Sequence, residues 1–131
     1  SYQQVSWTPS IAYFESSYTS FYVGSNGFVT FDSGNSSYSH SVAGLYTAPP
    51  RMAVMWDDLN PSSGGTITFD EYPDRVVVSW EDVPEYPDTG ANTFQIRIES
   101  SGVITFTYLG LTSTSNLVGI ANGNPYGLAV P

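Results

Sequence analysis

Two adjacent carboxylates, Asp57 and Asp58, are the side chains of this chain best suited to chemistry. They follow the apolar run AVMW at 53–56 and precede the turn-forming run NPSSGG at 60–65. Paired carboxylates can act as acid and base in glycoside hydrolysis when they flank one bond. Neighbouring residues at the end of a strand point to opposite faces, so this pair is poorly placed to converge on a substrate. The sequence therefore predicts a noncatalytic protein.

The same pair could instead hold the following turn or bind a metal ion. In the structural interpretation, one aspartate accepts backbone N–H groups of the loop 60–65, as in an Asx turn. The alternative is calcium, which takes about six to eight oxygen ligands, often from carboxylates and loop carbonyls. The structural interpretation is favoured. Calcium at Asp57 and Asp58 stays open, and no other cofactor is expected.

The other polar candidates match no catalytic or metal motif. The acidic residues between 81 and 88 lack the EF-hand spacing and are expected to form a solvated rim. His40 is the single histidine, and no G-x-S-x-G element accompanies it, so an exposed loop histidine is expected. Asn35 begins the triplet NSS, an N-glycosylation sequon in a predicted surface loop.

Aromatic side chains supply a second kind of candidate site. They make up 15% of the chain, and ten of them are tyrosines, whose rings can stack on sugars or anchor protein contacts. The three tryptophans, Trp7, Trp56 and Trp80, fall on apolar strand faces and are expected in the core. The tyrosines expected in loops are the contact candidates: Tyr38, Tyr46, Tyr72, Tyr86 and Tyr126.

Composition excludes several classes of partner. The 131 residues include three arginines, no lysine and twelve acidic residues, for a net charge of −9. Binding to nucleic acid or to anionic lipid needs clustered cations, so neither partner is expected. No stretch approaches the roughly 18 apolar residues of a membrane span. The length fits one domain, residues 1–131.

The elements that must position these side chains are strands. Apolar and polar residues alternate with a period of two in residues 66–69, 75–81, 92–99 and 102–108. The dipeptide Asn26-Gly27 predicts a hairpin with a type I′ turn. About ten short strands with turn signals between them predict an all-β, antiparallel, jelly-roll-like sandwich. Residues 32–48 lack this alternation and are expected to form a long surface excursion.

The two ends of the chain are apolar and could form terminal strands. Val5, Trp7 and Ile11 share one predicted face, and Pro9 between them belongs at an edge or a break. Residues 126–130, YGLAV, form a second short apolar run. Such strands can close their own sandwich, or they can leave it and complete a neighbouring copy. Strand exchange through Val5, Trp7 and Ile11 is therefore a hypothesis for self-assembly.

The order of these segments resembles a known family. Residues 18–31 read YTSFYVGSNGFVTF, and residues 49–59 read PPRMAVMWDDL, with the Trp-Asp-Asp-Leu strand end. Residues 65–69, 76–83, 92–108 and 118–123 follow in the same order, down to the closing VGIANG. This set is similar to bacterial extracellular β-sandwich modules related to the NIDO domain of nidogen. The match is weakest upstream, where residues 11–14, IAYF, only loosely follow the family pattern.

The resemblance implies a noncatalytic extracellular or cell-surface module, part of an adhesin or of a secreted protease. It carries no catalytic residue to transfer and does not name a ligand. Three hypotheses follow. The chain is an adhesion or structural module, a protomer of a surface fibre joined by terminal strand exchange, or a carbohydrate-binding module that uses loop tyrosines.

Overall fold

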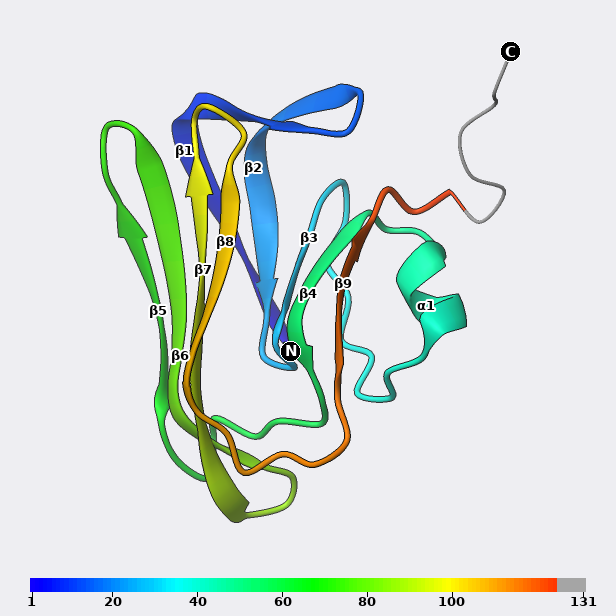
Figure 1. Ribbon diagram of the computed structural model, residues 1–131, viewed down its shortest axis with the longest axis vertical. Coiled ribbons are helices and arrows are strands. Elements are labelled where there is room, and N and C mark those ends of the chain that lie inside the picture. Colours follow the sequence, from blue (N-terminus) through cyan, green and yellow to red (C-terminus); the bar gives the residue numbers. More distant parts are fainter. Residues whose placement is uncertain (125–131) are drawn as a thin grey trace.

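Two antiparallel sheets face each other in the computed structural model, which describes residues 1–124 (Figure 1). The five-stranded sheet has the order β1 (Tyr2–Tyr13), β2 (Ser16–Gly24), β3 (Phe28–Thr30), β4 (Arg51–Trp56) and β9 (Leu117–Ala121). The four-stranded sheet has the order β5 (Thr66–Glu71), β6 (Arg75–Glu85), β7 (Thr89–Glu99) and β8 (Ile104–Gly110). The predicted all-β antiparallel sandwich is confirmed. The described residues contain nine strands, and the apolar run 126–130 lies outside them.

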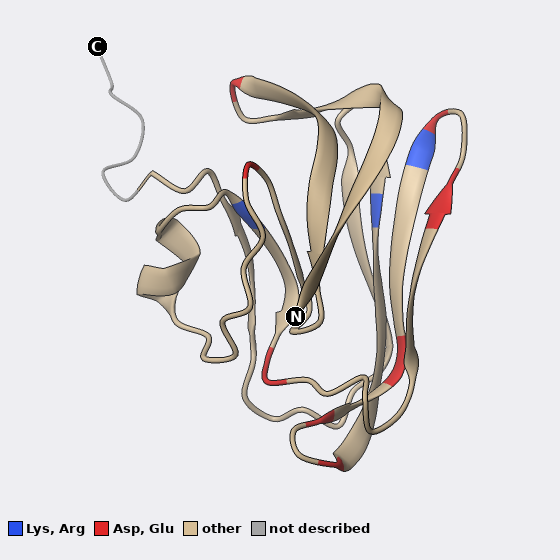
Figure 2. Cartoon of the chain, turned by 180° about the vertical axis from the view of Figure 1, so that it is seen from behind, with Lys and Arg blue, Asp and Glu red and all other residues tan. Residues whose placement is uncertain are grey.

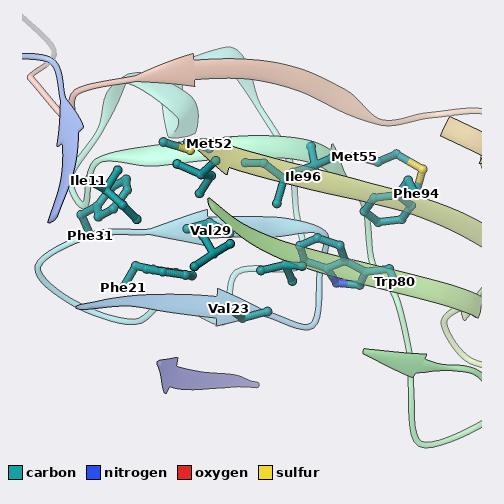
Figure 3. Packing of buried hydrophobic residues seen from close by; sticks show 14 of the residues in the cluster. Ile11, Phe21, Val23, Val29, Phe31, Met52, Met55, Trp80, Phe94 and Ile96 are labelled. Carbon is teal, nitrogen blue, oxygen red and sulfur yellow. The ribbon is translucent and has the colours of Figure 1, made fainter. Parts of the chain in front are cut away.

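The core lies between the sheets and is built from the alternating residues of their inner faces (Figure 3). Val78 on β6 pairs with Ile96 on β7, and all of both side chains is buried. The next inward pair is Trp80 and Phe94, whose rings stack with centroids 4.9 Å apart. Such aromatic pairs add roughly 0.5–1.5 kcal/mol beyond the area they bury.

Strand β1 follows the predicted odd-numbered pattern. Trp7, Ile11 and Tyr13 are buried, whereas the residues between them are exposed or half-buried. Pro9 lies where the β1–β2 register shifts, between Ser6 and Ile11. This placement agrees with the expectation for a residue that has no N–H to donate, on a strand at the edge of its sheet.

The hairpin at Asn26-Gly27 is confirmed, but its predicted turn type is wrong. Gly24 pairs with Phe28, so the loop has three residues, and the Gly27 N–H donates to the Gly24 carbonyl. A type I′ turn needs positive φ at both central residues, and of this pair Gly27 alone has one, at +84°. A three-residue loop with a left-handed glycine matches the geometry instead. A Cβ at Gly27 would collide with the Met55 carbonyl.

A second, smaller cluster covers the outer face of the five-stranded sheet. Residues 32–48 cross this face and include a short helix, α1 (Val42–Tyr46), which the sequence did not indicate. Ser41 caps the helix by accepting the Gly44 N–H at 2.9 Å. Leu45 packs there with residues from three strands: Phe28, Ala53, Trp56 and Ala121. The excursion is therefore packed against the sheet.

Charged side chains are sparse and mostly acidic, and they lie mainly at loops and strand ends (Figure 2). Blue segments are few. Of the three arginines, Arg51 on β4 is buried. Among residues 1–124, no helix has the length and apolar character needed to cross a membrane.

Candidate functional site

Asp57 ties the end of β4 to the loop between β8 and β9. One carboxylate oxygen, Oδ1, accepts the backbone N–H of Asp58 at 2.8 Å. The other, Oδ2, accepts the hydroxyl of Ser113 at 2.6 Å. Both oxygens of Asp57 are thus engaged within the fold. The expectation that an aspartate of this pair holds the loop 60–65 is wrong, because these partners lie elsewhere.

Asn60 holds that loop instead. Its Oδ1 accepts the N–H of Ser62 at 3.2 Å, which is the Asx turn, and its Nδ2 donates to the Pro87 carbonyl at 2.9 Å. A second asparagine side chain fixes the start of this loop, because Asn26 Oδ1 accepts the Leu59 N–H at 3.0 Å. Asparagine before Pro-Ser-Ser is itself a turn signal, so the pattern around Asn60 could have indicated this role.

Asp58 differs from Asp57 in having no hydrogen bond to its carboxylate from any of residues 1–124. Its side chain is half-buried. Burial raises the pKa of the Asp58 carboxyl above its ordinary value, and the neighbouring charge of Asp57 adds to the rise. Its backbone carbonyl accepts the Tyr86 N–H at 2.7 Å, so the main chain is anchored at this position while the carboxylate has no hydrogen-bond donor among residues 1–124.

Asp58 lines a polar hollow of about 240 Å³, here called the Asp58 hollow. Other residues that line it are Asn26, Ser36, Tyr38, Asn60 and Ser62. Tyr38 is 65% exposed and lines the same hollow, so its side chain is accessible to a ligand there. The fold therefore brings two predicted site residues, Tyr38 and Asp58, to one place although 20 positions separate them.

Two side chains fix the segment that carries Tyr38. Trp56 donates its indole N–H to the Ser37 carbonyl at 3.0 Å. Asn26 donates its side-chain N–H to the same carbonyl at 3.2 Å. Trp56 ends β4 and Asn26 lies in the β2–β3 hairpin, so the loop 36–38 is held beside the strand end that bears Asp58.

A family model described as NIDO related matches residues 2–130. The chain belongs to the NIDO-related family. Compared with curated proteins and with solved structures, it matches none. Family membership suggests an extracellular module, and no catalytic role is known for this family.

The other tyrosines of the NIDO-related domain are dispersed. Tyr86 is 63% exposed in the turn between β6 and β7, at the same end of the sandwich as Asp58. Tyr46 is 51% exposed on α1, not in a loop as expected. Tyr72 is 41% exposed in the β5–β6 turn, and the Arg75 guanidinium lies 4.0 Å from its ring centroid. Tyr126 lies outside the described residues.

The remaining polar candidates have local structural partners. Glu85 accepts hydrogen bonds from Asn92 at 2.9 Å and Thr112 at 2.8 Å. His40 is half-buried, with Nε2 3.4 Å from the Ser115 hydroxyl, so the expected exposed loop histidine is only partly correct.

Residues 1–124 hold no group of three or more histidine, aspartate or glutamate side chains placed for a metal ion. Calcium at Asp57 and Asp58 stays a prediction.

Glycosylation of Asn35 and strand exchange through Val5, Trp7 and Ile11 also stay predictions. Asn35 is half-buried, and its Oδ1 accepts the Ser37 N–H at 3.0 Å and an Arg51 N–H at 3.3 Å. Trp7 and Ile11 lie in the core of their own chain. Val5 lines a larger and more apolar hollow, about 340 Å³, between the edge strands β1 and β5. This larger hollow has no acidic or arginine side chain in its lining, so the Asp58 hollow is the better chemical candidate.

Proposed function

We propose that this NIDO-related domain is a noncatalytic adhesion module, secreted or displayed on a cell surface. The observation that carries the proposal is the family match over residues 2–130, which spans the whole sandwich. Composition is in keeping with it, because charged residues make up 11% of the chain and uncharged polar side chains must supply most of the surface. The proposed partner is a protein or a carbohydrate, with no role for nucleic acid.

The contact surface in this proposal is the Asp58 end, defined as the Asp58 hollow together with the neighbouring turn that carries Tyr86. Exposed tyrosines are effective contact residues because a large rigid ring and a hydroxyl are presented with little loss of rotamer freedom. Tyr38 and Tyr86 are the two most exposed tyrosines of the described residues. Because both tyrosines lie at one end of the sandwich, that end is a better candidate for the contact surface than α1 or the β5–β6 turn.

A carbohydrate is the second candidate partner, and the chemistry of the Asp58 hollow favours it. Sugar hydroxyls need hydrogen-bond acceptors and a ring to stack on. The hollow offers the unpaired Asp58 carboxylate and the exposed Tyr38 ring. The proposed role is binding without turnover, since Asp57 is engaged by Ser113 and leaves Asp58 without a second free carboxylate beside it.

The proposal is tested by binding to a panel of immobilised polysaccharides and extracellular proteins. We expect retention on at least one surface and loss of retention in Tyr38→Ala. Tyr46→Ala is the matched control, because Tyr46 is similarly exposed but lies on α1. Retention on a polysaccharide selects the second candidate, and retention on a protein selects the first. Release of a cleaved product, lost in Asp57→Asn or Asp58→Asn, would contradict the noncatalytic role.

A further inference from the structure

The larger hollow, between β1 and β5 and here called the β1–β5 hollow, lies where no large side chain closes the gap between the two sheets. Further along β1, Trp7 is buried between the sheets, and its indole N–H donates to the Tyr72 carbonyl at 3.1 Å. Earlier on the same face of the strand, β1 offers only Val5, which is half-buried, and Gln3, which is exposed. The hollow of about 340 Å³ falls within the range of roughly 300–1,000 Å³ for ligand pockets.

The lining of the β1–β5 hollow is mainly apolar and comes from both sheets. Its aliphatic and aromatic side chains include Val5, Val23, Ile67 and Phe69. Ile67 faces inward, because it pairs with Trp80, which is 0% exposed. Ile67 itself is only half-buried, so an apolar side chain of a ligand would remove further apolar surface from water.

Strand β5 borders the hollow with a free edge (Figure 1). It is the first strand of the four-stranded sheet, and an edge strand presents N–H and C=O groups with which an extended peptide can pair. Its register with β6 is unbroken from Thr66 to Glu71. β1, on the other side of the hollow, has a register shift between Ser6 and Ile11 and contains Pro9. β5 is therefore the better edge for an added strand.

The β1–β5 hollow adjoins the Asp58 hollow, because Ser25 and Pro61 line both. The loop that follows Asp58 leads directly into β5. Asp58, whose carboxylate has no hydrogen-bond donor among residues 1–124, therefore lies near the start of the free edge. A ligand that follows β5 meets first this carboxylate and then the apolar lining.

The charges along this edge favour a basic ligand. Asp70 and Glu71 are exposed at the far end of β5. Arg75, which follows the next turn, pairs with Asp74 at 2.8 Å and so does not offset them. The chain has no lysine and a net charge of −9, so a second copy would be repelled from this edge and a basic segment attracted to it.

We propose that β5 binds an extended, basic peptide segment of a partner protein, which adds to the sheet as a strand. Its backbone pairs with the free edge, an apolar side chain enters the β1–β5 hollow, and a lysine or arginine reaches Asp58. A peptide is the occupant that matches all three features, because one extended chain combines backbone donors and acceptors, apolar side chains and a cation. This partner rests on the proposed adhesion function and narrows it to protein binding.

The test starts from a phage-displayed library of short random peptides, selected against the whole chain. We expect enriched sequences with apolar residues at alternate positions and a lysine or arginine toward one end. A synthetic peptide of the enriched sequence is then the probe, and fluorescence anisotropy gives its dissociation constant. Binding of this probe should slow hydrogen exchange of the amides of β5, because the added strand covers them.

Two pairs of variants separate the apolar contact from the acidic one. Val5→Trp fills the hollow, and Ser6→Trp places the same ring on the exposed face of β1. Asp58→Asn removes the charge beside the hollow, and Asp88→Asn removes an exposed charge between β6 and β7. We expect Val5→Trp and Asp58→Asn each to raise the dissociation constant about tenfold or more, and the two controls to leave it unchanged. Melting temperatures check that all four variants are folded.

Three results would overturn the peptide site. Enrichment of no sequence, or of sequences without a basic residue, would exclude it. Equal binding of the probe to Val5→Trp and Ser6→Trp would place the apolar contact elsewhere. Slower exchange at β8 with β5 unchanged would assign the added strand to the other edge of the sheet, a readout that needs no variant to fold. Each result leaves the adhesion function standing if the wild type is retained on a protein or polysaccharide surface, whereas retention on none would remove both.

Discussion

The Trp56 indole N–H lies 3.0 Å from the Ser37 carbonyl and joins the end of β4 to the surface excursion. Trp56 is 1% exposed, and its ring packs edge-on against Phe28 at 5.5 Å. The residue after Ser37 is Tyr38, and the two residues after Trp56 are Asp57 and Asp58. Together with the bond from Asn26 to the same carbonyl, this hydrogen bond holds the segment that carries Tyr38 beside the strand end that carries Asp58.

Replacing Trp56 by phenylalanine should loosen the excursion. The variant loses the hydrogen bond to Ser37 and leaves a small cavity, which together cost about 1–3 kcal/mol of unfolding free energy. Hydrogen exchange of the amides in residues 35–38 should accelerate. Trp80→Phe is the control, because Trp80 also donates to a backbone carbonyl, that of Gly24, but does not touch the excursion. Equal exchange in residues 35–38 for both variants would contradict the anchoring role of Trp56.

The bond between Asp57 and Ser113 should be measurable as a coupling energy. A double-mutant cycle with Asp57→Asn and Ser113→Ala isolates it from the other contacts of each residue. A hydrogen bond to a charged group contributes roughly 1.5–3 kcal/mol, and partial exposure places this bond toward the low end. Urea denaturation of the four proteins gives the value. Strictly additive effects would mean that the bond does not stabilise the fold.

Asp58 should destabilise the folded state at neutral pH. Its pKa is raised by burial first and by Asp57 second, so ionisation is less favourable in the folded state than in the unfolded state. The penalty is absent where Asp58 is protonated in both states, and it grows as pH rises through the ordinary aspartate range, near 4. Asp58→Asn should therefore raise the melting temperature at pH 7, and the gain should vanish below about pH 3. A lower melting temperature at pH 7 would show that the charge makes a favourable contact.

The same variant tests the calcium hypothesis. A bound cation would relieve the penalty at Asp58 and stabilise the folded state by mass action. If Asp58 is a ligand, millimolar calcium should raise the melting temperature of the wild type and leave Asp58→Asn unchanged. Magnesium, with its smaller radius and stricter geometry, is the control ion. An equal shift in both proteins would assign the effect to another site or to ionic strength.

Arg51 should tolerate replacement by an apolar side chain of similar length. Its guanidinium lies 4.3 Å from the Phe28 ring centroid and 4.1 Å from that of Trp56. The side chain is 3% exposed, and burial lowers its pKa to about 10. Arg51→Ala should cost about 2–4 kcal/mol by leaving a cavity between the rings. Arg51→Met should recover most of that loss, because filling the space contributes more than a charge that is buried without a carboxylate.

A Met variant as unstable as Ala would show that the cation itself holds the rings. Guanidinium–aromatic contacts stabilise by up to about 2 kcal/mol when desolvated, which is enough to produce that outcome. Chemical denaturation gives the free energies, and the near-ultraviolet circular dichroism of Trp56 reports whether the small cluster stays packed.

Most of the sandwich could be predicted from sequence because its strands have a local signature. Alternation placed Trp80, Phe94 and Ile96 on inner faces, and the structure confirms their burial. The hairpin loop Ser25-Asn26-Gly27 is predictable from its residues, but the type I′ turn is wrong because all three residues form the loop and only Gly27 of the Asn-Gly pair has a positive φ. α1 was missed since five residues carry too little periodicity to be seen.

The candidate site was only partly predictable, because its geometry depends on long-range contacts. Tyr38 and Asp58 are each identifiable from residue type, but their proximity depends on the bonds from Trp56 and Asn26 to the Ser37 carbonyl. The aspartates were expected to hold the loop 60–65, but Asp57 bonds to Ser113 and Asn60 holds that loop. No local pattern distinguishes the engaged carboxylate from the unpaired one.

The most direct test of the central claim, noncatalytic binding at the Asp58 hollow, compares three proteins on the same immobilised panel. We expect the wild type and Tyr46→Ala to be retained on the same surface, Tyr38→Ala to be lost from it, and the bound material to release no product. Retention of Tyr38→Ala at the level of the wild type, or turnover of the bound material, would contradict noncatalytic binding at the Asp58 hollow.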